Sequence, residues 1–137
     1  MDNAYRDAML EHMAELEEEL SEYRDFIKEN PKPKIMTYRA IEKNIQLLIE
    51  ACIGIAKQAI KAKGKQVPSD ARQVFNKLAA LGLDESSADW KRIVGMRNAL
   101  VHDCLNLDPE RVMAVVKSNQ YQVLIEFAVK TLKRLSN

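Results

Sequence analysis

The chain has 137 residues and a formal net charge of +1, which is enough sequence for one domain and too little for two independent cores. Hydrophobic residues make up 47% of it and charged residues 30%, a balance that predicts a packed core and excludes a disordered chain. With only 4 glycines and 4 prolines, the sequence favours long helices over the many turns of a β-sandwich. We therefore predict a single all-α domain over residues 1–137.

The sequence does not indicate a membrane protein, a secreted protein or a metal-binding protein. The longest nearly uncharged apolar run, residues 45–56, is shorter than the roughly 20 residues that span a bilayer. The N-terminal segment lacks the basic start and apolar block of a signal peptide. Cys52 and Cys104 are too few for a disulfide framework or a zinc site by themselves. We expect a cytoplasmic protein with no membrane segment, metal ion or cofactor.

Charge is distributed unevenly along the chain. Residues 1–30 carry ten acidic and three basic side chains, whereas residues 31–68 carry two acidic and eight basic ones. Such blocks are explained most simply by pairing of neighbouring helices and by solubility. The basic stretch from Lys57 to Lys65 also fits contact with a polyanion. Charge alone leaves both interpretations open.

Five helices are predicted from apolar periodicity and from helix-capping signals. Pro31 and Pro33 separate the first two, Ser69 is the expected N-cap of the third, and Gly82 is its C′ residue. Cys52 lies in the apolar stripe of the second helix, where a free cysteine packs as a small hydrophobe. The expected bounds, in chain order, are about Asn3 to Glu29, Met36 to Lys61, Ser69 to Gly82, Asp84–Ser87 through Val101, and Asp108-Pro109 to about Leu135. The pattern is that of an up-and-down helical bundle.

The fourth helix contains an arginine where its apolar period expects a core residue. Val94 and Leu100 continue the inward stripe at steps of three, and Arg97 lies between them. A guanidinium keeps its proton, so an unpaired buried arginine is strongly destabilising. Arg97 must therefore pair with a carboxylate, line a wet cleft or await an anionic ligand.

Two further polar residues follow Arg97 on the same helix. Asn98 and His102 are four residues apart and share a face, so the amide can hydrogen-bond the imidazole or its ligand. Arg97 lies about 140° around the helix from His102, but its long side chain can swing toward the same opening. The other histidine, His12, falls among glutamates of the first helix and is expected to be a solvated surface residue.

An arginine beside a histidine suits cleavage of RNA without a metal. The imidazole can take the proton of a 2′-OH or give one to the leaving oxygen, and the guanidinium can hold the phosphate. The pattern by itself is weak, because Arg-x4-His arises often by chance. The structural alternative is an ion-paired Arg97 beside a His102 that only caps the helix.

A longer stretch resembles a known family. Residues 92–112, RIVGMRNALVHDCLNLDPERV, resemble the signature of the HepT-like HEPN family, an Arg and a His separated by four residues, often with Asn after the Arg and usually Tyr two residues after the His. The similarity extends through MTYRAIEKNIQLLIEACIGIA at 36–56 and ARQVFNKLAALGL at 71–83.

The resemblance implies a helical endoribonuclease toxin of a type II/VII-like toxin–antitoxin system, acting on tRNA or mRNA. In such proteins two motifs line one cleft of a homodimer that cuts RNA without a metal. Their antitoxin is a minimal nucleotidyltransferase, which in characterised members attaches AMP to the motif tyrosine. Carried over, Arg97 contacts the phosphate, His102 is the catalytic acid or base, and Asn98 orients its neighbour.

Cys104 departs from the family pattern, since it stands where tyrosine is usual. A thiol cannot be AMP-modified at a tyrosyl oxygen, so this chain is either controlled by antitoxin binding alone or disarmed at this position. A second hypothesis is that the bundle is a non-catalytic binding partner of the nucleotidyltransferase.

Overall fold

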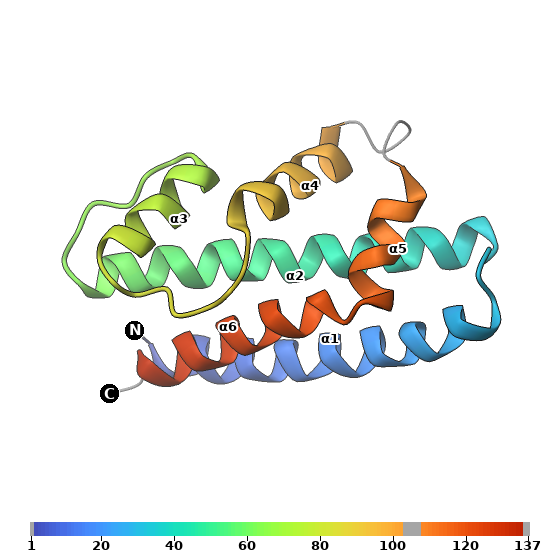
Figure 1. Cartoon of the computed structure of the whole chain (residues 1–137). Coiled ribbons are helices and arrows are strands. Elements are labelled where there is room, and N and C mark those ends of the chain that lie inside the picture. The colour runs from blue at the N-terminus through green and yellow to red at the C-terminus, as the bar shows by residue number, and fades with distance from the viewer. Residues whose placement is uncertain (1, 103–107, 136–137) are drawn as a thin grey trace.

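The computed structural model describes residues 2–102 and 108–135, and these residues form α-helices and no strand (Figure 1). The helices, in chain order, are α1 (Asn3–Glu29), α2 (Ile35–Ala62), α3 (Ala71–Ala80), α4 (Trp90–His102), α5 (Pro109–Lys117) and α6 (Gln120–Arg134). The all-α helical bundle is confirmed, and the first two helices agree with their predicted bounds to within one residue at each end.

The central element of the bundle is α2. It contacts α1 and α6 on one side, and α3 and α4 lie along its other side (Figure 1). α6 also packs along α1, and α5 contacts both α1 and α6. The longest side chains with almost no exposure come mainly from α1 and α2, including Leu20, Ile41, Leu48 and Ile55. The core is therefore built around α2, which also contacts α4.

The predicted fifth helix is wrong as a single element. It divides into α5 and α6 at Ser118 and Asn119, so the described residues contain six helices where about five were expected. Asn119 has a positive φ of 63°, in the left-handed region that asparagine tolerates better than most residues. The segment has no proline or glycine to mark the break. This turn redirects the chain, so that α5 and α6 run at a steep angle to each other (Figure 1).

The third and fourth helices also begin later than predicted. Asp70, and not Ser69, is the N-cap of α3, because its carboxylate accepts a hydrogen bond from the backbone N–H of Arg72 at 2.8 Å. Gly82 is the C′ residue as predicted, with φ of 71°, and its N–H bonds the carbonyl of Ala79.

Asp84 organises the connection between α3 and α4 and does not start a helix. Its carboxylate accepts hydrogen bonds from the backbone N–H and hydroxyl of Ser86, at 3.0 and 2.6 Å, and from the indole N–H of Trp90 at 2.8 Å. Trp90 is the first residue of α4. Its ring stacks on that of Phe75, with 3.9 Å between the ring centroids, and packs edge-to-face with that of Phe127, with 4.7 Å between the centroids. Because of these hydrogen bonds residues 84–86 form a turn, and α4 begins only at Trp90, whose indole is buried.

Cys52 is a packing residue, as predicted. Its side chain is completely buried, and its thiol donates to the carbonyl of Leu124 at 3.6 Å. Burial raises the pKa of the thiol far above its usual range, so it stays protonated. Within the described ranges, no helix combines the length and apolar character needed to cross a bilayer.

Asp84→Ala is expected to destabilise the fold by about 1–3 kcal/mol, since it leaves a partly buried indole N–H and a serine hydroxyl without their acceptor. Urea unfolding followed by fluorescence measures this directly, because Trp90 is the one tryptophan in the chain. The matched control is Asp7→Ala, which removes an exposed carboxylate paired only with its neighbour Arg6. Equal unfolding midpoints for the two variants would contradict the role given to Asp84.

Candidate functional site

The C-terminal half of α4 carries the polar residues singled out by the sequence. Arg97 is half-buried, and its Nη1 lies 3.2 Å from Oε1 of Glu50 on α2. The two side chains keep 23% and 45% of their surface exposed, respectively. Of the three environments predicted for Arg97, the structure thus shows pairing with a carboxylate, and the partner comes from the helix against which α4 packs.

The pairing leaves part of the guanidinium free. Arginine has five N–H donors, and the ion pair with Glu50 uses Nη1. The Nε atom is buried and has no hydrogen-bond partner among the residues that the structure describes. Because the stem of Arg97 is packed while its far end meets an exposed carboxylate, the guanidinium lies at the edge of the α2–α4 contact, where an anion can still approach it.

His102 and Asn98 lie on the same end of α4. His102 is the last residue of the helix and is exposed, whereas Asn98 is partly buried. An exposed imidazole can exchange protons with water or with a substrate, which a core histidine cannot do. Cys104 lies outside the described residues. His12, on α1, is partly exposed, away from the polar residues of α4 in the sequence.

Sequence reasoning missed Glu50, although a signal for it was present. Residues 31–68 contain only two acidic side chains, Glu42 and Glu50, and both fall in the apolar helix α2. Together with Tyr38 and Gln46 they recur at steps of four, which places them along one stripe of that helix. An isolated acid in a basic and apolar segment is a good candidate partner for an arginine in a predicted core position.

Glu42 and Tyr38 form the buried end of this stripe. The Oε2 atom of Glu42 and the hydroxyl of Tyr38 are both buried, and neither has a hydrogen-bond partner in the described part of the chain. Burial raises the pKa of Glu42, an effect that the nearby Arg39 guanidinium partly opposes. Burial also raises the pKa of Tyr38 to about 12, and the adjacent Glu42 carboxylate adds to the rise.

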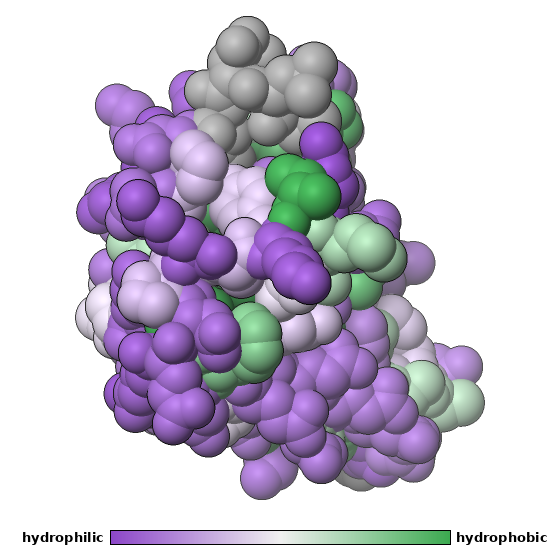
Figure 2. Space-filling view, turned by 90° about the vertical axis from the view of Figure 1, so that its right-hand side faces the viewer, coloured by the Kyte–Doolittle hydropathy of each residue, from purple (hydrophilic) through white to green (hydrophobic). Residues whose placement is uncertain are grey.

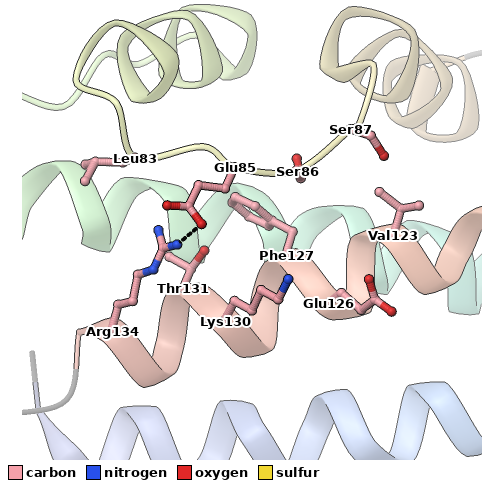
Figure 3. A pocket seen from close by; sticks show the side chains of 10 residues that line it. All are labelled: Leu83, Glu85, Ser86, Ser87, Val123, Glu126, Phe127, Lys130, Thr131 and Arg134. Carbon is pink, nitrogen blue, oxygen red and sulfur yellow. Dashed lines mark ion pairs between the residues drawn. The ribbon is translucent and has the colours of Figure 1, made fainter.

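A separate pocket lies between the α3–α4 connection and α6 (Figure 3). It measures about 210 Å³, and an ion pair between Glu85 and Arg134 joins its two walls. Neither Arg97 nor His102 lines it. Across the described ranges, no group of three or more His, Cys, Asp or Glu side chains is arranged to hold a metal ion. The candidate site is therefore the open end of α4 and not this pocket.

Among the residues that the structure describes, large apolar side chains are exposed at a few places. They are Phe26, Ile35 and Met36, which flank the α1–α2 connection, and Val101, which precedes His102. Figure 2 views the end of the molecule that carries the α1–α2 connection and shows a mainly hydrophilic surface with small, separate apolar areas. Val101, at 45% exposure, thus places an apolar side chain beside the candidate site.

The sequence was compared with known protein families and with proteins of known structure. The family model described as "Ribonuclease HepT-like" matches residues 9–131. The chain belongs to the HepT-like ribonuclease family. A relative from Archaeoglobus fulgidus, named "Putative RNase", is 32% identical over 96 residues, which are 69% of this chain and 71% of the relative. The "mRNA nuclease HepT" of Shewanella oneidensis is 36% identical over 76 residues, 54% of this chain and 57% of that protein.

A solved structure has the same fold. The crystal structure described as "the toxin-antitoxin with AMP-PNP" superimposes with a TM-score of 0.73 and 23% sequence identity, and it covers 96% of this chain and 99% of its own. The resemblance to HepT-like proteins inferred from the motif is thus confirmed at the level of family and fold. The comparisons do not bear on Cys104.

For this HepT-like chain, the buried Glu42 predicts a pH-dependent stability. Since its pKa is raised in the folded state, the folded chain binds the Glu42 proton more tightly than the unfolded chain, and stability falls as pH rises above the ordinary glutamate pKa. Glu42→Gln lacks this dependence and is expected to unfold at a higher temperature than the unaltered chain at neutral pH.

Thermal unfolding measured from about pH 4 to about pH 8 tests this expectation, because the advantage of Glu42→Gln should grow with pH through the titration range. Glu15→Gln, at an exposed position of α1, removes the same charge without relieving burial and is the matched control. A difference between Glu42→Gln and the unaltered chain that does not change with pH would refute the assignment.

Proposed function

We propose that this chain is a metal-independent endoribonuclease toxin that uses Arg97 and His102. The observation that carries the proposal is the combination, on the last turns of α4, of an exposed imidazole and a guanidinium that keeps part of its surface exposed beside the Glu50 carboxylate. Membership of the HepT-like ribonuclease family supports it independently. The first of these groups can move a proton and the second can bind a phosphate, which together are what RNA cleavage requires.

The proposed reaction is attack of a ribose 2′-oxygen on its own 3′-phosphate. The His102 imidazole takes the 2′-OH proton, the 2′-oxygen forms a bond to phosphorus, and the bond from phosphorus to the 5′-oxygen of the next nucleotide breaks. A protonated imidazole gives its proton to that leaving oxygen, so charge and atoms balance. Arg97 stabilises the negative charge that develops on the phosphate oxygens, and Asn98 orients the imidazole or the substrate.

We further propose that two copies share one cleft, so that one His102 acts as the base and the other as the acid. Val101, which is apolar, exposed and next to His102, supports an interface at this end of α4.

If two copies share one cleft, light scattering at micromolar concentration is expected to give about twice the chain mass of 15.6 kDa. Val101→Asp is expected to shift the mass toward that of the monomer, whereas Met36→Asp, at a more exposed apolar residue on α2, is not. A monomer for the unaltered chain contradicts the shared cleft.

The proposed partners are an RNA, either tRNA or mRNA, and a minimal nucleotidyltransferase antitoxin, all in the cytoplasm. The fold shared with a protein of a solved toxin–antitoxin structure supports an antitoxin. Cys104 has no phenol oxygen to receive AMP, so we propose that the antitoxin controls this chain by binding alone. A non-catalytic bundle that only binds the nucleotidyltransferase is the alternative, since Glu50 already gives the Arg97 charge a partner without RNA.

Cleavage of bulk tRNA and mRNA in the presence of a chelator distinguishes these possibilities. His102→Ala and Arg97→Ala are each expected to lower the rate by about 100-fold or more. His12→Ala, the matched control at the other histidine, should cleave like the unaltered chain. Arg97→Ala should still fold, because a half-exposed ion pair contributes about 0–1 kcal/mol. Undiminished cleavage by either α4 variant, with contaminating nuclease excluded, would sink the proposal.

Cys104→Tyr, measured in the same assay, separates an active chain from a disarmed one. Cleavage by the unaltered chain makes Cys104 compatible with catalysis, whereas cleavage by Cys104→Tyr alone means that the native cysteine disarms the site. No cleavage by any of these proteins favours the non-catalytic binding partner.

A further inference from the structure

We propose that Glu50 is the positioning residue of the site, holding the guanidinium of Arg97 in the orientation that receives the scissile phosphate. This inference rests on the proposed function. Oε1 of Glu50 lies 3.2 Å from Nη1 of Arg97, and the contact joins the middle of α2 to the functional helix α4. Glu50 thus acts on the RNA through Arg97 and does not itself take part in the chemistry.

Stability does not explain why a carboxylate occupies this place. With 45% of the Glu50 side chain and 23% of the Arg97 side chain exposed, the ion pair is solvated and contributes little to folding. Attraction of RNA does not explain it either, because a negative charge beside a phosphate-binding arginine repels the polyanion. Residues 31–68 otherwise carry eight basic side chains and one other acid, Glu42, so Glu50 stands against the charge of its own segment.

Control of the arginine conformation does explain it. An arginine has a long side chain with many rotamers, and a guanidinium that must be ordered during binding loses affinity and rate. In this chain the Nε atom is already buried, so the stem is packed against the protein, and Glu50 contacts the far end. Because the contact uses Nη1, the guanidinium keeps further N–H groups with which to hold a phosphate oxygen.

The opposite role, in which Glu50 is a latch that occupies the place of the phosphate, predicts the reverse effects. If the carboxylate only competes with RNA, its removal frees Arg97, and both Glu50→Gln and Glu50→Ala bind RNA more tightly and cleave it faster. If it positions Arg97, the two variants differ, because the glutamine side-chain oxygen can still contact Nη1 from the place of the Glu50 carboxylate whereas alanine cannot. Comparison of the two variants therefore separates the effect of the negative charge of Glu50 from its effect on the position of Arg97.

The test is steady-state cleavage of a fluorescent oligoribonucleotide by the unaltered chain, Glu50→Gln and Glu50→Ala, with Glu15→Gln as a control for loss of one exposed negative charge. We expect kcat to fall about 10- to 100-fold in Glu50→Ala. In Glu50→Gln we expect kcat near that of the unaltered chain with a lower KM, since repulsion of the phosphate is removed. Unchanged kcat in Glu50→Ala, a rise in both variants, or equal losses in both variants would each overturn the proposal.

A second readout keeps the test valid if the chain does not cleave RNA. Binding of the same oligonucleotide with 2′-O-methyl groups, which block attack by the 2′-oxygen, is measured for Glu50→Ala, Arg97→Ala and the double variant. If Glu50 acts through Arg97, Glu50→Ala weakens binding severalfold in the unaltered background and has no effect once Arg97 is absent. Additive or absent effects on binding would overturn the inference about Glu50, whereas silence in the cleavage assay alone would count only against the nuclease proposal.

Discussion

The structure depends on the burial of α2. This helix has neighbours on opposite sides, and 12 of its 28 residues are buried, with Ile41, Ile45, Ile55 and Ile60 almost wholly removed from water. A helix in that position can accommodate very few polar side chains without a cost. Of its two acidic residues, Glu50 lies where the bundle is open to solvent and has Arg97 as a partner, whereas Glu42 is buried and its Oε2 has no hydrogen-bond partner among the described residues.

The site on α4 follows from this constraint. α4 packs on α2, its residues Val94 and Leu100 are buried, and the same helical period brings Arg97 to the carboxylate of Glu50 on α2. There the guanidinium pairs with Glu50 and remains partly exposed, so its charge is neither buried without a partner nor fully solvated. His102 follows five residues later, as the last residue of the helix, and is exposed. One short helix thus carries both a partly buried guanidinium that can bind an anion and an exposed imidazole that can transfer a proton.

The charge asymmetry of the sequence is satisfied in part by this arrangement. The acidic α1 and the basic-flanked α2 are neighbours, as helix pairing predicts, and Asn44 on α2 donates to Glu19 on α1 at 2.9 Å. Glu17 on α1 likewise accepts from Gln122 on α6 at 2.7 Å. These contacts use amides and not lysines. The lysines at the C-terminal end of α2, from Lys57 onward, take no part in these two contacts.

The sequence by itself determined the helical class, the bounds of the two long helices, the glycine that ends α3 and the motif on α4. Each of these depends on local chemistry: apolar periodicity, the backbone freedom of Gly82 and the order of residues between Arg97 and His102. The start of α4 and the break between α5 and α6 were predicted wrongly. Both are set by competition between helix propensity and contacts made elsewhere, by the Asp84 carboxylate with the Trp90 indole and by the packing of two differently directed helices on α1.

The tertiary structure alone decided the environment of Arg97. Periodicity identified an arginine in the wrong place and left three explanations, because the partner of a side chain is a matter of distance in space. Glu50 lies 47 positions earlier in the sequence, and only the packing of α4 on α2 brings its carboxylate to Arg97. Likewise, the apolar pattern of α2 did not show that Glu42 would be buried while Glu50 would stay exposed, since that difference depends on where the neighbouring helices end.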